Sequence, residues 1–182
     1  MKKIFVVLIL LITFNGFGQT FKKPTKGKAL VYIIRGNSIG NGYNIRVYDG
    51  KRFLGPLPGR AYFTYECEPG EHLFWAASEN RDFVEANLSA NKIYVIDLRA
   101  KLGLVHMAVG VEPYTPSNPK HLKRFKKAIN KHINAVIYGK ERSDEKKENI
   151  EKAFKSYKSI KNNRHSKIKK LTSDMSFSID NF

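Results

Sequence analysis

The sequence has a single cysteine, Cys67, among 182 residues, so no disulfide can form within the chain. It also has no continuous apolar run of about 20 residues, the length that a membrane-spanning helix needs. Acidic residues are scarce, because 16 Asp and Glu stand against 33 Lys and Arg. These absences exclude a disulfide-stapled scaffold, and they predict a fold held by its core or by a partner.

The first residues are typical of a secretory signal peptide. Residues 1–19 combine two early lysines, an apolar run that ends at Phe14, and small residues at Gly16 and Gly18. The apolar run is too short to cross a bilayer as a helix, and an uncleaved membrane anchor is the alternative. We expect cleavage after Gly18 or Gln19. Because no cysteine stands directly after the run, we expect export to the periplasm or the cell exterior without a lipid anchor.

The positive charge is concentrated near the C-terminus. Residues 120–170 hold 18 basic and five acidic side chains, which accounts for +13 of the net charge of +17. The three prolines of EPYTPSNP separate this part from an aromatic part that is punctuated by Gly and Pro. We therefore divide the mature chain into a β-sandwich domain at 20–116, a basic helix at 117–139 that packs on the sandwich, and a basic helical tail at 140–182 with a frayed end.

From Lys28 onward, short runs of β-branched and aromatic residues alternate with turn signals, which is an all-β pattern. Asp49-Gly50 is the strongest hairpin signal among the turns. The sequence predicts a mainly β fold: a small antiparallel β-sandwich of seven to eight strands, followed by two C-terminal basic amphipathic α-helices. The runs are KALVYIIR, YNIRVYD, KRFLG, RAYFTYECE, EHLFWAAS, DFVEANLS, KIYVIDLR and GLVHMAVGV.

Four of these segments also carry a family resemblance: VYDGK, YFTYE, PGEH and KIYVI. In this order they resemble the bacterial family called domain of unknown function 2846, over about Lys28 to Val111. The resemblance implies a small exported β-domain of envelope proteins, similar to PEGA-like sandwich modules, and it brings no catalytic residues. Many members are lipoproteins, whereas this chain lacks the acylated cysteine.

The stretch YECEPGEH, residues 65–72, places a Pro-Gly turn between two apolar runs. A tight turn here would pair Cys67 with His72 across a hairpin. The pair has two interpretations: a thiol-imidazole couple of an enzyme, or two side chains of the core. We favour the core, because the same strand face carries Phe63 and Phe74, and because acidic neighbours do not favour a thiolate.

Two other groups of side chains have a functional and a structural interpretation. Trp75 and nearby tyrosines could form a platform for sugar rings, but large aromatic side chains more often fill a core. The histidines lack the spacing of three or four residues that helical metal sites favour, so we expect no metal and no cofactor. Besides His72, they are His106, His121, His132 and His165.

The Lys-rich part predicts two amphipathic helices. The first, residues 117–139, begins with a cap at Ser117 or Asn118, has Pro119 at its first position and ends at Gly139. The second has acidic residues early and lysines late, as the helix dipole favours. Each helix has one apolar stripe. The candidate contacts to an anionic surface are Lys123, Arg124, Lys126, Lys127, Lys131, Lys152, Lys155 and Lys158.

These patterns favour an exported, non-enzymatic envelope protein that binds or has a structural role. Its basic tail would contact an anionic membrane, a glycolipid surface or a protein partner. One alternative is a thiol-dependent enzyme that uses Cys67 and His72. The other is a nucleic-acid binder that uses the Lys-rich tail, which export makes less favourable.

Overall fold

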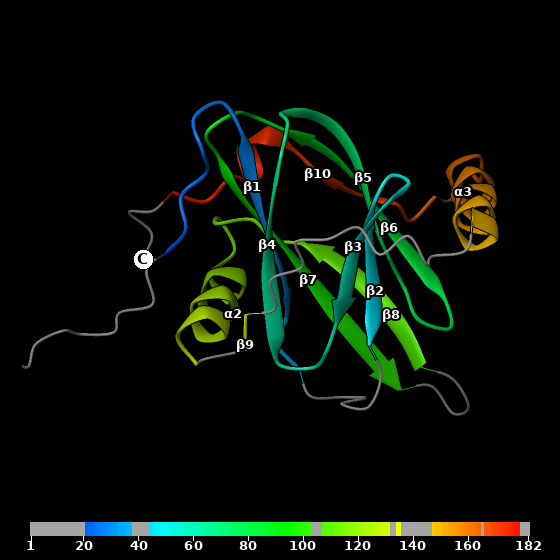
Figure 1. Ribbon diagram of the computed structural model, residues 1–182, viewed down its shortest axis with the longest axis horizontal. Helices are drawn as coiled ribbons and strands as arrows, with labels where there is room; N and C mark the ends of the chain where they lie inside the picture. The colour runs from blue at the N-terminus through cyan, green and yellow to red at the C-terminus, as the bar shows by residue number, and fades with distance from the viewer. Residues whose placement is uncertain are drawn as a thin grey trace, which may run out of the picture.

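The computed structural model describes residues 21–37, 44–102, 107–131, 134–135, 147–164 and 166–178. They form two five-stranded sheets that pack as a sandwich, with two helices outside (Figure 1). Sheet A has the strand order β8-β7-β1-β4-β9, and sheet B has β10-β6-β5-β2-β3. The predicted mainly β sandwich is therefore confirmed. The elements are β1 Ala29–Arg35, β2 Ile45–Asp49, β3 Arg52–Leu57, β4 Ala61–Cys67, β5 Gly70–Ala77, β6 Arg81–Leu88, β7 Ile93–Leu102, β8 Met107–Pro113, α2 Pro119–Asn130, β9 Asn134–Ala135, α3 Lys147–Lys161, β10 Lys169–Leu171 and a 3-10 turn Ser173–Met175.

Strand pairing is antiparallel in five pairs, as predicted, and parallel in three. The most extensive parallel pair joins β1 to β7, with Leu30 opposite Ile93. All seven residues of β1 are buried. Its run of ALVYII lacks polar alternation because both faces of the strand are covered, the inner face by sheet B and the outer face partly by α2.

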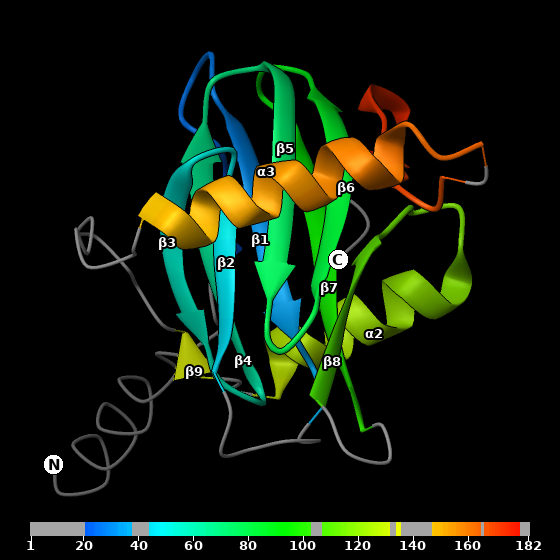
Figure 2. The ribbon, with the colours of Figure 1, turned by 90° about the vertical axis from the view of Figure 1, so that its right-hand side faces the viewer.

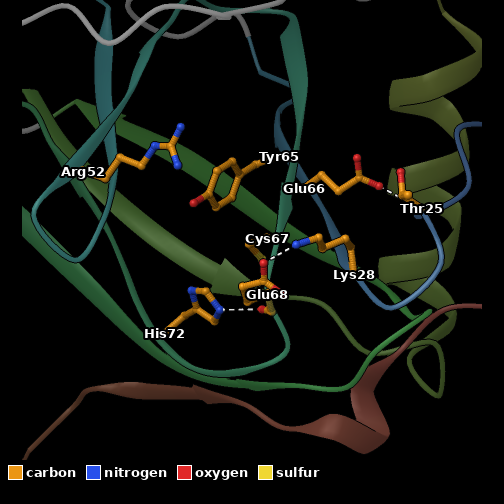
Figure 3. A pocket seen from close by; sticks show the side chains of 8 residues that line it. All are labelled: Thr25, Lys28, Arg52, Tyr65, Glu66, Cys67, Glu68 and His72. Carbon is orange, nitrogen blue, oxygen red and sulfur yellow. Dashed lines mark hydrogen bonds and ion pairs between the residues drawn. The ribbon is translucent and has the colours of Figure 1, made fainter.

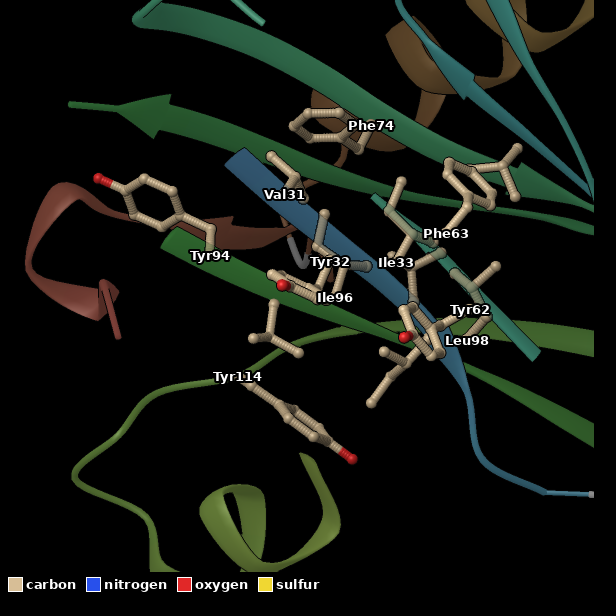
Figure 4. Close-up of a cluster of buried hydrophobic side chains, with 14 of the residues drawn as sticks. Val31, Tyr32, Ile33, Tyr62, Phe63, Phe74, Tyr94, Ile96, Leu98 and Tyr114 are labelled. Atoms are coloured by element: carbon tan, nitrogen blue, oxygen red, sulfur yellow. The ribbon is translucent and has the colours of Figure 1, made fainter. Parts of the chain in front are cut away.

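The inner faces of the two sheets form the main core (Figure 4). Val31 and Phe63 from sheet A are at most 4% exposed, and they belong to the same cluster as Phe74 from sheet B. The hairpin β2–β3 turns at Gly50 and Lys51, where Gly50 has a φ of 54°. A positive φ at this position suits glycine, so the sequence prediction of a hairpin at Asp49-Gly50 is confirmed.

Each outer face of the sandwich carries one basic helix. α2 packs on the outer face of sheet A, where Phe125 contacts Tyr32 of β1. α3 crosses the outer face of sheet B (Figure 2), where it covers Tyr48, Trp75 and Phe83 as part of a second apolar cluster. Neither helix, nor any other helix in the described part of the chain, is long and apolar enough to cross a membrane.

The C-terminal part differs from the prediction in two places. The helix predicted for 117–139 ends at Asn130, and Asn134–Ala135 then pairs with β4 as the short strand β9; the predicted end at Gly139 lies outside the described residues. The prediction of a frayed end is wrong for residues 166–178. There β10 pairs with β6, and Phe177 is 3% exposed and bridged to Ile93. These residues are ordered by pairing with strands far away in the sequence.

Candidate functional site

Cys67 and His72 lie at one end of the sandwich, but they do not form a hairpin pair. β4 pairs with β1, so Cys67 lies opposite Ala29, while β5 pairs with β6 and β2 in the other sheet. The predicted register across the Pro-Gly turn is therefore wrong. The turn carries the chain from sheet A to sheet B, with Gly70 at a φ of 117°. The two inner faces still meet, because Tyr65 and Phe74 are in ring contact.

His72 is held in a hydrogen-bonded network between the two sheets. Its Nδ1 lies 2.7 Å from Oδ2 of Asp49, and its Nε2 lies 2.8 Å from the carbonyl oxygen of Glu68. The same Asp49 oxygen accepts a hydrogen bond of 3.1 Å from the hydroxyl of Tyr65. The side chains of His72 and Asp49 are only 13% and 12% exposed. The network therefore ties β2 and β5 of sheet B to β4 of sheet A.

The imidazole of His72 is charged in this network. The hydrogen bond to Asp49 and the contact with Cys67 raise its pKa from 6.5 to about 10, against the opposing effect of burial. A protonated ring donates from both nitrogens, which is what the two short contacts require. Such a ring has no lone pair with which to deprotonate a thiol. Cys67 itself is 7% exposed, so the prediction that it is buried is confirmed.

Above this network lies an open depression of about 480 Å³. Figure 3 shows that Lys28, Glu66 and His72 each make a polar contact with another residue that lines it. The ammonium of Lys28 pairs with Glu68, and the carboxylate of Glu66 accepts from the backbone N–H of Thr25. The guanidinium of Arg52 lies 5.8 Å from the centre of the Tyr65 ring. Cys67 and His72 both line this depression, but Cys67 is 7% exposed and both ring nitrogens of His72 lie at hydrogen-bond distance from oxygen atoms.

His121 is part of a different polar cluster, at the start of α2. Its ring stacks on Tyr114 with centroids 4.2 Å apart, and its Nδ1 accepts the N–H of Thr115 at 3.1 Å. Burial lowers the pKa of His121, which agrees with a neutral ring that accepts a hydrogen bond. In the described ranges no three His, Cys, Asp or Glu side chains are grouped as metal ligands. The other histidines of the sequence prediction, His106, His132 and His165, lie outside these ranges.

Trp75 belongs to the second apolar cluster. It is 2% exposed, and its ring stacks on Tyr48 with centroids 3.7 Å apart and an interplanar angle of 3°. Its indole nitrogen donates to the carbonyl of Gly50 at 2.7 Å. With α3 lying over this pair, the rings are not available to a sugar, and the core interpretation is the correct one.

α2 and its C-terminal cap residue, Lys131, carry five of the eight predicted anionic-surface contacts. Asn118 caps the helix by accepting the N–H of Lys120 at 3.0 Å, and Pro119 follows as predicted. The apolar stripe is buried on sheet A, with Phe125 at 0% and Ile129 at 5% exposure. No acidic residue occurs between Pro119 and Asn130. Lys126 is half-buried, and the exposed cations are Lys120, Lys123, Arg124, Lys127 and Lys131.

The remaining predicted contacts, Lys152, Lys155 and Lys158, are exposed on α3. Because α3 covers sheet B and α2 covers sheet A, the predicted set is divided between opposite faces of the sandwich (Figures 1 and 2). The charge of α3 is also partly neutralised, since Lys152 pairs with Glu148 at 2.6 Å. A flat surface could therefore contact only one of the two helices at a time. Of the two, α2 has fewer of its positive charges paired with acidic residues of the same helix.

No family model, no curated protein and no solved structure matches the chain. The resemblance to the domain of unknown function 2846 therefore stays a prediction. The sequence analysis also missed Asp49 as the partner of His72 and Arg52 as a neighbour of Tyr65. The only local signal was the Asp-Gly turn, which predicts the hairpin but not the strand that its carboxylate reaches.

Proposed function

We propose that the chain is an exported, non-enzymatic envelope protein that contacts an anionic membrane surface through helix α2. The observation that supports this most directly is the composition of the exposed side of α2. It presents Lys120, Lys123, Arg124, Lys127 and Lys131, and the helix has no acidic residue. The signal-peptide pattern of residues 1–19 in the sequence supports export.

The contact is peripheral and electrostatic, because the apolar side of α2 is already used. Phe125, Ala128 and Ile129 are at most 5% exposed against sheet A, so the helix has no free apolar stripe to insert among lipid chains. Each lysine near an anionic membrane contributes about 1 kcal/mol, and several together bind a protein that lacks a lipid anchor. Because screening acts over about 8 Å at physiological ionic strength, binding weakens as salt is added.

Two matched variants test the proposal. One replaces Lys120, Lys123 and Lys127 of α2 by Gln, and the control replaces Lys152, Lys155 and Lys158 of α3 by Gln. Both remove three charges, but from opposite faces. In sedimentation with vesicles of phosphatidylcholine and phosphatidylglycerol at low salt, we expect the α2 variant to bind about a hundredfold more weakly. The α3 variant should bind almost as well as the natural chain.

Three results would contradict the proposal: undiminished binding of the α2 variant, equal losses in both variants, or binding that does not depend on salt. Equal losses would mean that net charge alone attracts the chain to the vesicles, without a defined surface. Circular dichroism and thermal unfolding of both variants show whether the fold is kept.

The two alternatives have less support. A thiol-dependent enzyme would need an accessible Cys67 and an imidazole free to exchange a proton with it, whereas Cys67 is buried and both nitrogens of His72 are engaged with Asp49 and Glu68. A nucleic-acid binder could use the same cations of α2, because phosphates attract them equally. An exported chain does not meet nucleic acid as its ordinary partner. Competition between a DNA duplex and the vesicles compares the two directly.

A further inference from the structure

The described chain begins with an N-terminal segment, residues 21–28, whose first residue, Phe21, lies beside α2 although almost a hundred residues separate them in sequence. Phe21 stacks on Tyr32 of β1 with ring centroids 5.1 Å apart, and it meets Phe125 of α2 edge-on at 5.5 Å. Figure 1 shows this segment, in blue, beginning next to α2. Phe21 therefore anchors the N-terminal segment on the outer face of sheet A.

The backbone that follows Phe21 is fixed as well. The N–H of Lys22 donates to the hydroxyl of Tyr32 at 2.9 Å, and this hydroxyl lies 3.2 Å from the carbonyl oxygen of Lys22, to which it can donate. Two lysines are thus held at a defined place next to the helix, with exposed side chains. The ammonium of Lys22 lies 4.0 Å from a carboxylate oxygen of Glu66, at the limit of an ion pair. For Lys23, the described part of the chain shows no ion pair.

We propose that Lys22 and Lys23 form one cationic surface together with the exposed cations of α2, and that anionic lipid headgroups are its partner. This inference rests on the proposed function and adds a second segment to it. The sandwich would then lie with the outer face of sheet A toward the lipid and with α3 on the opposite side. Membrane headgroups suit such a surface because it is built from two separate segments, and lipids can move to meet the charges of both.

Because the N-terminal segment is anchored on the sandwich, its lysines should bind a surface more strongly than lysines on a flexible terminus. A flexible terminus loses conformational freedom when it binds, and this loss offsets part of the attraction. The ring contacts of Phe21 and the hydrogen bonds of Lys22 have already fixed this segment in the fold. Lys22 and Lys23 therefore contribute to binding without that additional cost in their backbone.

The experiment compares Lys22→Gln/Lys23→Gln with Lys155→Gln/Lys158→Gln, which removes the same charge from α3. Binding is measured by sedimentation with vesicles of phosphatidylcholine and phosphatidylglycerol at several salt concentrations. We expect the Lys22→Gln/Lys23→Gln chain, the N-terminal variant, to bind about fivefold more weakly for each charge removed. Its binding should also depend less on the salt concentration. The α3 variant should bind like the natural chain. Vesicles of phosphatidylcholine alone should bind none of them.

The outcomes separate this inference from the proposed function. If the α2 variant loses binding while the N-terminal variant does not, the surface consists of α2 alone and the inference is wrong, while the proposed function stands. If neither variant loses binding, the proposed function fails. If the N-terminal and α3 double variants lose equally, net charge explains the binding and the composite surface is excluded.

Discussion

The two outer faces of the sandwich are each covered by a basic helix, but the contacts beneath the helices differ. On sheet A, Phe125 of α2 is fully buried and meets rings from Phe21, Tyr32 and Phe177. On sheet B, Ala153 is the buried residue of α3. There the helix is also held by polar bonds from Tyr157 and Lys161 to Glu85, at 2.6 and 2.7 Å.

This difference shows that similar charge patterns can accompany different structural roles. α2 uses its apolar stripe for the main core and leaves its cations without acidic neighbours in the helix. α3 has Glu148 and Glu151 among its lysines, and the charge of Lys161 is used to hold the helix on the sheet. The lysine-rich part of the sequence therefore contains one helix that has no acidic residue of its own and one whose cations partly pair with acidic residues of the protein.

The largest expected effect comes from truncating the buried ring of α2. Phe125→Ala should lower the free energy of unfolding by about 3–5 kcal/mol, because it leaves a cavity among three aromatic neighbours. The matched change in α3, Phe154→Ala, should cost about 1 kcal/mol or less, since Phe154 is only half-buried. Urea unfolding of both variants measures the difference. Equal losses would show that both helices are integrated to the same extent.

An intermediate loss of stability is expected for a change at His72. This residue links the two sheets and touches neither helix. Its pKa is raised from 6.5 to about 10, so its stabilising contribution is complete below pH 6.5 and is lost as the pH rises through about 10. His72→Gln should cost about 2 kcal/mol at neutral pH. Urea unfolding at a series of pH values should show the natural chain losing its advantage over the variant toward alkaline pH. A constant difference at every pH would contradict the charged imidazole.

The smallest expected effect concerns the polar attachment of α3. Glu85→Gln removes the charge that pairs with Lys161 and weakens the bond from Tyr157. The exposed position of this pair limits its effect on global stability. We expect hydrogen exchange in α3 to become severalfold faster while exchange in α2 stays the same. Faster exchange in both helices would mean that the two faces are coupled.

Much of the β-domain could be predicted because its signals are local. The eight runs of the sequence correspond to β1 through β8, and the turn at Gly50 follows from the Asp-Gly signal. The inward side of β4 and β5 was also predictable, because residues two apart in a strand share a face. This explains why Cys67 was correctly predicted to be buried although its strand partner was wrong.

Apart from the β2–β3 hairpin, strand partners could not be predicted, because they depend on contacts that are distant in sequence. A Pro-Gly turn such as the one that leads into β5 is compatible with a hairpin and with a crossing between two sheets. The crossing forms here because β4 pairs with β1 and β5 pairs with β6. β9 and β10 have two and three residues, which is too short for a periodic pattern. Phe177 likewise has no local signal for its place against Phe125.

The parallel pairing of β1 with β7 has a consequence for the order of folding. Leu30 needs Ile93 as its neighbour, and the ring of Phe125 is enclosed only when Phe177 arrives near the end of the chain. Such non-local contacts slow folding, because long loops must close before any contact is gained. A chain synthesised only as far as β6 therefore leaves one edge of β1 without its strand neighbour. The export that we propose would benefit from this delay, because a chain that folds late is still unfolded when it enters a translocation channel.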